Sequence, residues 1–219
     1  MSRVWRTPGL AALLAGSGLW AGLYLGRVGY SGRFVYGFLL WNLFLAWVPW
    51  LLSLPVAWAI THRRRSVGIV ALLAWVAFLP NAPYVITDFL HLTVRSPVPL
   101  WYDVLLLGTA SITGLLAGAF SLRRVEESLD GRVHPWLLQA GVWVVILASG
   151  FGIYLGRFER WNSWDVLVHP MSLGQSLLNM PTPRAAVVTA ACAGLLGVAY
   201  LAVRHQGRGW VNDPESGRD

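Results

Sequence analysis

Long apolar runs divide this chain, and they constrain its fold more than any other feature of the sequence. A helix needs about 20 predominantly apolar residues to cross about 30 Å of hydrocarbon. The sequence therefore predicts an all-α fold, a polytopic transmembrane helical bundle of about six spans. We expect one membrane domain over 1–205 and a mobile polar tail over 206–219. The predicted spans are 9–26, 34–60, 67–87, 100–120, 136–156 and 185–203.

The charge pattern supports membrane placement and argues against a nucleic-acid partner. Only 12% of the residues are charged, about half the share in an average soluble domain. The net charge of +7 comes from 17 arginines without any lysine. These arginines stand between the apolar runs, where they contact lipid headgroups. Membrane lipid is therefore the expected partner, and a protein partner or self-association stays open.

The distribution of arginines predicts the orientation of the spans. Six spans place both termini on one side, and cytoplasmic loops carry the excess of basic residues. Eleven arginines fall on the terminal side, at positions 3, 6, 63, 64, 65, 123, 124, 132, 204, 208 and 218. Six fall on the other side, at positions 27, 33, 95, 157, 160 and 184. We therefore expect both termini in the cytoplasm.

The third apolar run is interrupted near its outer end by an unusual polar stretch. Residues 78–91 read FLPNAPYVITDFLH. Each proline removes a backbone donor and disfavours helix at the preceding residue. Asn81, between the prolines, is well placed to bond the freed backbone groups. A broken helix at this depth requires protein or water to satisfy its backbone.

A second polar stretch follows the fifth span on the same side. Residues 157–170 read RFERWNSWDVLVHP, within about 28 residues that contain no clear span. Loops of this length in a compact domain are usually functional. We expect an interfacial loop with a short helix over 172–180. The two polar stretches are predicted to meet and form a shared outer site.

Acids and histidines in the two stretches suggest a metal or acid–base site. Such a set can hold a divalent ion and activate water for hydrolysis or group transfer at the membrane surface. The candidate metal ligands, which are also the catalytic candidates, are Asp88, His91, Asp165 and His169. In the alternative interpretation, Asp88 and Asp165 form ion pairs with arginine: Arg95, Arg157 or Arg160.

Arginine and tryptophan in the second stretch suggest a binder or transporter of a small anionic ligand or lipid headgroup. Guanidinium groups bind carboxylate or phosphate through two parallel hydrogen bonds, and aromatic rings can cover the ligand. The expected contact residues are Asn81, Arg157, Arg160, Trp161, Asn162 and Trp164. Arginine and tryptophan at a span end also form an ordinary interfacial belt, and a scaffold subunit of a membrane complex is the third alternative.

Both stretches resemble one family. FLPNAPYVITDFLHL at 78–92 and GRFERWNSWD at 156–165 are similar to the DUF1361 family of bacterial membrane proteins. The resemblance implies a multi-span protein of the bacterial cytoplasmic (inner) membrane. The family has no assigned function, so the resemblance identifies no catalytic residue and no substrate.

Overall fold

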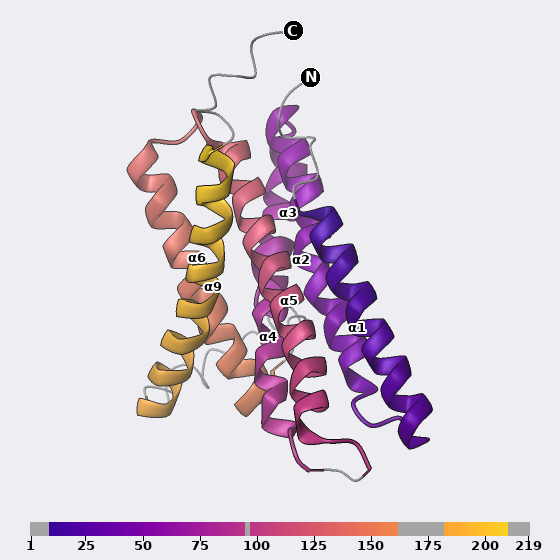
Figure 1. The fold of residues 1–219 in the computed structure, drawn as a ribbon. Helices are drawn as coiled ribbons and strands as arrows, with labels where there is room; N and C mark the ends of the chain where they lie inside the picture. The colour runs from indigo at the N-terminus through magenta and orange to yellow at the C-terminus, as the bar shows by residue number, and fades with distance from the viewer. Residues whose placement is uncertain (1–8, 95–96, 162–181, 210–219) are drawn as a thin grey trace, which may run out of the picture.

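The computed structural model describes residues 9–94, 97–161 and 182–209, and these fold into helices without any strand. Long helices run along one another in a bundle (Figure 1). The helices are α1 (Leu10–Ser31), α2 (Phe38–Thr61), α3 (Arg65–Phe78), α4 (Asn81–Tyr84), the 3₁₀ helix η2 (Val85–His91), α5 (Leu100–Leu129), α6 (Pro135–Phe158) and α9 (Pro183–Gly209).

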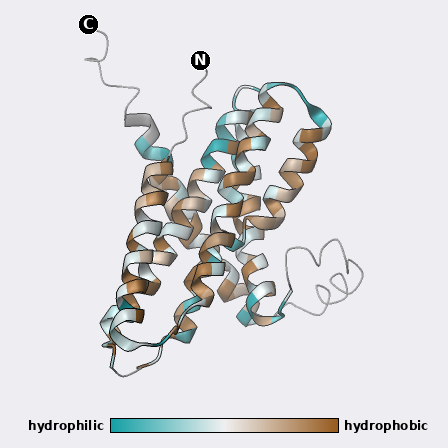
Figure 2. Ribbon diagram, turned by 90° about the vertical axis from the view of Figure 1, so that its right-hand side faces the viewer, coloured by the Kyte–Doolittle hydropathy of each residue, from teal (hydrophilic) through white to brown (hydrophobic). Residues whose placement is uncertain are grey.

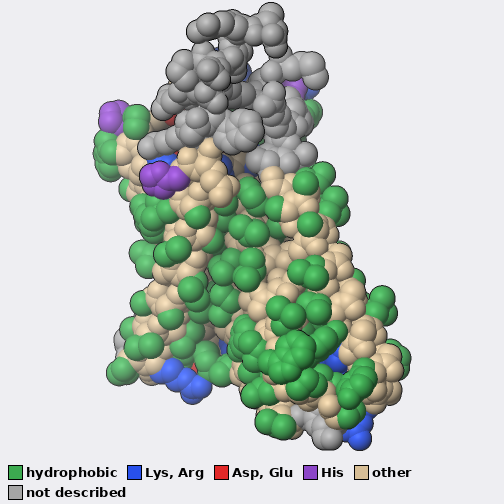
Figure 3. Space-filling view, viewed as in Figure 1, with side chains coloured by type: hydrophobic (Ala, Val, Ile, Leu, Met, Phe, Trp, Pro, Cys, Tyr) green, Lys and Arg blue, Asp and Glu red, His purple; other side chains and the backbone are tan. Residues whose placement is uncertain are grey.

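Five helical segments of the described chain are long and apolar enough to cross a membrane, which confirms the prediction of a polytopic all-α bundle. They are Phe38–Thr61, Arg65–His91, Leu100–Leu129, Pro135–Phe158 and Pro183–Gln206. Apolar residues predominate along the middle of the helices (Figure 2), and hydrophobic side chains cover much of the middle of the face seen in Figure 3. Helix α1, predicted as the first span, is not among these five, although it lies along α5.

Helix α5 occupies the centre of the bundle. It contacts α1, α2, α4, η2 and α9, while α6 packs mainly on α9. Helix α1 starts and α9 finishes at the same end of the bundle (Figure 1), which we call the terminal end. The other end, called the distal end, carries the α1–α2 connection, η2 and the start of α5. The stretch over 78–91 therefore ends at the distal end, and the stretch that starts at Arg157 begins there.

The predicted break in the third span is present, and its geometry follows from the prolines. Helix α3 ends at Phe78, one turn of α-helix follows, and the chain then continues as the 3₁₀ helix η2. The Asn81 side-chain amide donates to the Phe78 carbonyl at 2.9 Å. Asn81 thus satisfies a backbone group at the break, as the sequence predicts, and it is only partly buried.

Glycines on the two neighbouring helices receive the broken segment. A Cβ added at Gly114 of α5 would collide with the Ala82 carbonyl oxygen. On α6, a Cβ at Gly152 would come within 2.7 Å of the Pro80 ring. Small residues let helices approach closely in a membrane. The break is therefore clamped between α5 and α6 by close backbone packing.

Helix α5 is longer than the predicted fourth span, 100–120. It continues to Leu129, and its last turns carry charged residues. Glu126 is buried because Arg123, Gln139 and Arg204 all contact its carboxylate, at 2.8, 2.8 and 3.2 Å. These partners come from the same helix, α6 and α9, and they make helical continuation through the charges favourable.

The predicted loop after the fifth span lies largely outside the described residues. Helix α6 ends at Phe158 and α9 begins at Pro183, close to the predicted bounds. The short helix expected over 172–180 falls among residues that the structure does not describe. Helix α9 extends to Gly209, six residues beyond the predicted end of the last span, because the hydropathy boundary does not mark the helix end.

Candidate functional site

A buried carboxylate at the distal end brings the two sequence stretches together. The Asp88 side chain, on η2, is fully buried. Asn42 of α2 donates to its Oδ2 at 2.7 Å, and Arg157 of α6 lies 3.4 Å from its Oδ1. This ion pair is one of those named in the alternative interpretation of the sequence. Three helices distant in sequence are joined at one acid.

Arg157 is anchored to the broken segment by more than its charge. Its Nη2 donates to the Thr87 carbonyl at 3.0 Å, and its Nη1 reaches the Tyr84 hydroxyl at 3.5 Å. The guanidinium also lies 5.7 Å from the centre of the Tyr84 ring. A guanidinium has five N–H donors. The contacts with the Thr87 carbonyl, the Tyr84 hydroxyl and Asp88 together use at most three of them. The side chain remains 14% exposed, so Arg157 lies at the surface of the protein and is not fully enclosed by it.

The candidate metal ligands do not assemble around Asp88 in the described part of the chain. Residues 88 and 91 are three apart on η2, but Asp88 is buried whereas His91 is exposed. His91 instead stacks edge-on against Phe38 at 5.1 Å. The described residues contain no group of three His, Cys, Asp or Glu side chains able to hold a metal. The remaining candidates, Asp165 and His169, lie outside the described residues.

The predicted anion-binding residues are placed in part. Arg160 is exposed just after α6 and has a left-handed backbone, with φ of 59°. Trp161 is half-buried, and its backbone N–H donates to the Leu155 carbonyl at 3.1 Å. Asn162 and Trp164 lie outside the described residues. At the start of α9, Arg184 stacks on the Phe158 ring at 4.1 Å, a basic residue that the sequence analysis did not select.

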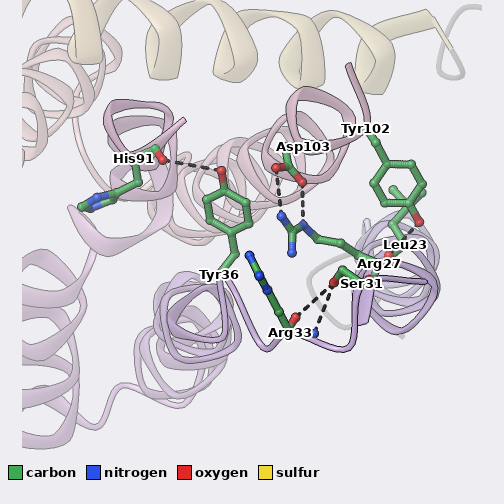
Figure 4. Close-up of polar contacts among 8 residues, drawn as sticks. All are labelled: Leu23, Arg27, Ser31, Arg33, Tyr36, His91, Tyr102 and Asp103. Atoms are coloured by element: carbon green, nitrogen blue, oxygen red, sulfur yellow. Dashed lines mark hydrogen bonds and ion pairs between the residues drawn. The ribbon is translucent and has the colours of Figure 1, made fainter. Parts of the chain in front are cut away.

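A second buried ion pair lies at the distal end, and sequence reasoning missed it. Arg27 of α1 binds Asp103 of α5 through two parallel contacts, from Nε to Oδ1 at 2.6 Å and from Nη2 to Oδ2 at 3.1 Å (Figure 4). Both side chains are only 1% exposed. Tyr36 lies over the guanidinium, 5.1 Å from ring centre to Cζ. This pair fastens α1 to the central helix.

A short sequence similarity links Arg27 to Arg157 and could have pointed to the second ion pair. Residues 22–27 read GLYLGR and residues 152–157 read GIYLGR. In both cases the glycine before the arginine meets a tyrosine: a Cβ at Gly26 would lie 2.9 Å from the Tyr102 hydroxyl, and one at Gly156 would lie 3.5 Å from the Tyr84 ring. In both cases the arginine then pairs with a buried aspartate.

Tyr36 adds a strained backbone to this region. Its φ is 67° and its side chain is buried, an uncommon state for a bulky residue. Its hydroxyl lies 3.5 Å from the His91 carbonyl (Figure 4). Strained residues persist only where the surroundings hold them, and here Arg27 and the end of η2 do so. The α1–α2 connection is therefore a fixed part of the distal end.

Comparisons with known proteins identify the family. A family model described as "Protein of unknown function (DUF1361)" matches residues 41–198. No curated protein and no solved structure matches the chain. The matched region runs from α2 into α9 and includes Asp88 and Arg157, while α1 lies before it. Since this match spans more than half of the sequence, the chain belongs to the DUF1361 family.

Proposed function

We propose that this protein is a multi-pass protein of the bacterial cytoplasmic membrane that binds the anionic group of a lipid headgroup or small solute at its distal end. The observation that carries the proposal is Arg157, whose guanidinium is held by Asp88 and the Thr87 carbonyl while its side chain stays 14% exposed. A guanidinium held in this way is already oriented for a carboxylate or phosphate.

The charges around Arg157 favour an anion. Arg160 and Arg184 are exposed at the same end. Two described acids near Arg157 already have partners. Asp88 is held by Asn42 and Arg157, and Glu159 accepts a hydrogen bond from Tyr154 at 3.3 Å. Clustered basic groups raise the local concentration of anions.

The same contacts argue against a cation at Asp88. Asn42 donates to one carboxylate oxygen and Arg157 lies beside the other. A divalent ion there would compete with both and would stand next to a positive charge. The metal-dependent alternative therefore rests on Asp165 and His169, and the anion-binding proposal has the better support.

The membrane orientation belongs to the same proposal. The terminal end carries the larger number of arginines, so it faces the cytoplasm under the positive-inside rule. The distal end, with Arg157 and Arg160, then faces the outer leaflet and the space beyond it. The proposed ligand is accordingly an outer-leaflet headgroup or an external solute.

Two arginines of similar backbone conformation provide a matched test. Arg160 and Arg63 are both exposed, both follow a helix end, and both have positive φ, at 59° and 55°. Glycine adopts this conformation without strain, so Arg160→Gly and Arg63→Gly should both fold. We expect Arg160→Gly to reduce retention of phosphatidylglycerol by purified protein several-fold, as measured by native mass spectrometry, and Arg63→Gly to leave it unchanged.

A solute is distinguished from a lipid by a second readout. If citrate raises the melting temperature of wild-type protein, and Arg160→Gly removes the effect, the ligand is a solute. Wild-type levels of anionic lipid and solute binding in both Arg160→Gly and Arg157→Gln would contradict the proposal. Equal losses in Arg160→Gly and Arg63→Gly would indicate non-specific charge attraction and would contradict it as well.

A further inference from the structure

At the opposite end of the bundle, one arginine is buried with no carboxylate of the described residues within ion-pair distance. Arg124 of α5 is 2% exposed. Its Nη1 donates to the Ser53 hydroxyl at 2.7 Å and to the Trp50 carbonyl at 3.3 Å. The guanidinium lies 4.7 Å from the centre of the Trp50 ring. Its Nε and Nη2 are buried and have no hydrogen-bond partner in the described part of the protein.

The two unpartnered atoms, Nε and Nη2, form the edge of the Arg124 guanidinium through which arginines commonly bind oxyanions. Nε and Nη2 point in the same direction and match the two oxygens of a carboxylate or phosphate. This protein already contains an occupied example. Arg27 binds Asp103 through the same two nitrogens (Figure 4). Arg124 presents the same edge, which we call the Arg124 fork, without an oxygen on it.

Two described acids near Arg124 on α5, Glu126 and Glu127, are held by other residues. Glu126 is held by Arg123, Gln139 and Arg204. Glu127 lies 2.8 Å from the Nε of Arg123. The Trp50 indole N–H is also buried without a hydrogen-bond partner among the described residues, and it belongs to the ring that the Arg124 guanidinium faces.

The energetics favour an external partner for the Arg124 fork. Arginine does not lose its proton in proteins, so burial cannot neutralise Arg124. A buried charge without a counter-charge is strongly destabilising, and unpaired buried N–H groups add to the penalty. An oxyanion on the fork would compensate the charge and use the free donors. The site lies near the C-terminal end of α5, within reach of the headgroup region at the terminal end.

We propose that the Arg124 fork binds an oxyanion group, either the phosphate of a phospholipid or a free phosphate ion. The Nε and Nη2 donors contact two oxygens, and the Trp50 N–H supplies a third hydrogen bond. The fork is covered in this structure, so the ligand enters when the side chains over it move. The proposal is independent of the distal-end function, because the two sites lie at opposite ends of the bundle (Figure 1).

The test compares Arg124→Lys with Arg123→Lys in the full-length protein. Lysine keeps the charge but loses the fork. We expect inorganic phosphate, at constant ionic strength, to raise the melting temperature of the wild type in a saturable manner. Arg124→Lys should need about tenfold more phosphate for the same shift. Arg123→Lys, which keeps the charge on a neighbouring arginine of the same helix, should retain the wild-type response. Native mass spectrometry of the same samples measures retained phosphatidylglycerol.

Each outcome assigns the ligand or rejects the site. A phosphate response that is lost in Arg124→Lys and retained in Arg123→Lys assigns a free ion to the fork. Phospholipid that is lost from Arg124→Lys and retained by Arg123→Lys assigns a lipid phosphate to it. A third variant decides the remaining case, because Arg124→Met removes the buried charge altogether. If Arg124→Met melts at the wild-type temperature or higher, and Arg124→Lys changes neither readout, the fork is vacant in solution and the proposal is overturned.

Discussion

Residues far apart in sequence pair at the distal end, and the two ion pairs there differ in burial. Arg27 and Asp103 are both 1% exposed, whereas Arg157 is 14% exposed beside a fully buried Asp88. A lone charge left in a buried site costs far more than one that can reach water. The two aspartates should therefore respond differently to the same substitution.

Substitution by asparagine tests this difference directly. Asp103→Asn leaves Arg27 buried without a counter-charge, and we expect a loss of about 3–5 kcal/mol in the free energy of unfolding. Asp88→Asn should lose less, because the Arg157 side chain can turn toward solvent and Asn42 can bond the new amide. Denaturant unfolding in detergent micelles measures both. A larger loss for Asp88→Asn would show that exposure does not rank these pairs.

Sequence reasoning found Asp88 and Arg157 but not the whole cluster. Both belong to polar stretches that interrupt apolar runs, which is a readable signal. Asn42 stood out only as a polar residue inside a span, and Arg27 and Asp103 looked like ordinary span-end residues. Which side chains meet depends on the rotation of each helix about its axis, and the hydropathy of a span does not determine that rotation.

At the scale of helices, the broken segment and its glycine neighbours form one packed unit. Pro80 and Ala82 press against α6 and α5 at positions that lack a side chain. The sequence predicted the break from its prolines and predicted close helix approach from its glycine spacing. It did not predict that these features meet, since the identity of the neighbouring helix is a property of the tertiary fold.

Two glycines of α6 make a matched pair for testing this packing. A Cβ at Gly152 would crowd the Pro80 ring, at 2.7 Å, whereas a Cβ at Gly141 would meet nothing within 4 Å. Alanine is favoured over glycine inside a helix by about 0.5–1 kcal/mol. Gly141→Ala should thus be neutral or stabilising, and Gly152→Ala should lower the melting temperature by several degrees. Thermal unfolding of both variants measures the difference, and similar melting temperatures would argue against the clamp.

At the scale of the whole molecule, the number and order of apolar segments were enough to predict a helical bundle. Length and apolarity predicted a helix in each of the regions now occupied by α2, the α3–η2 segment, α5, α6 and α9. The length of α5 was underestimated, because Glu126 is solvated by partners from α6 and α9 that a linear reading does not reveal. A buried helix can contain polar residues when neighbouring helices supply hydrogen-bond partners, and the sequence alone does not identify those partners.

Accessibility labelling tests the orientation of the bundle. In a Cys192→Ala background, Arg33→Cys places a thiol at the distal end and Asp130→Cys places one at the terminal end; both positions are exposed. We expect a membrane-impermeant maleimide to label position 33 in intact cells and position 130 only after the membrane is opened. The reverse pattern would place the terminal end outside and would move the proposed anion site to the cytoplasmic face.

The pairing of Arg27 with Asp103 also bears on how the chain is made. Helix α1 is not among the five strongly apolar segments, and it carries an arginine whose counter-charge lies 76 residues further along the chain. During synthesis α1 emerges long before α5, so it must wait at the membrane with that charge uncompensated. Its final position is therefore set after α5 has been inserted. A nascent chain stopped before residue 100 should leave α1 more readily extracted from the membrane than the same helix in the complete protein.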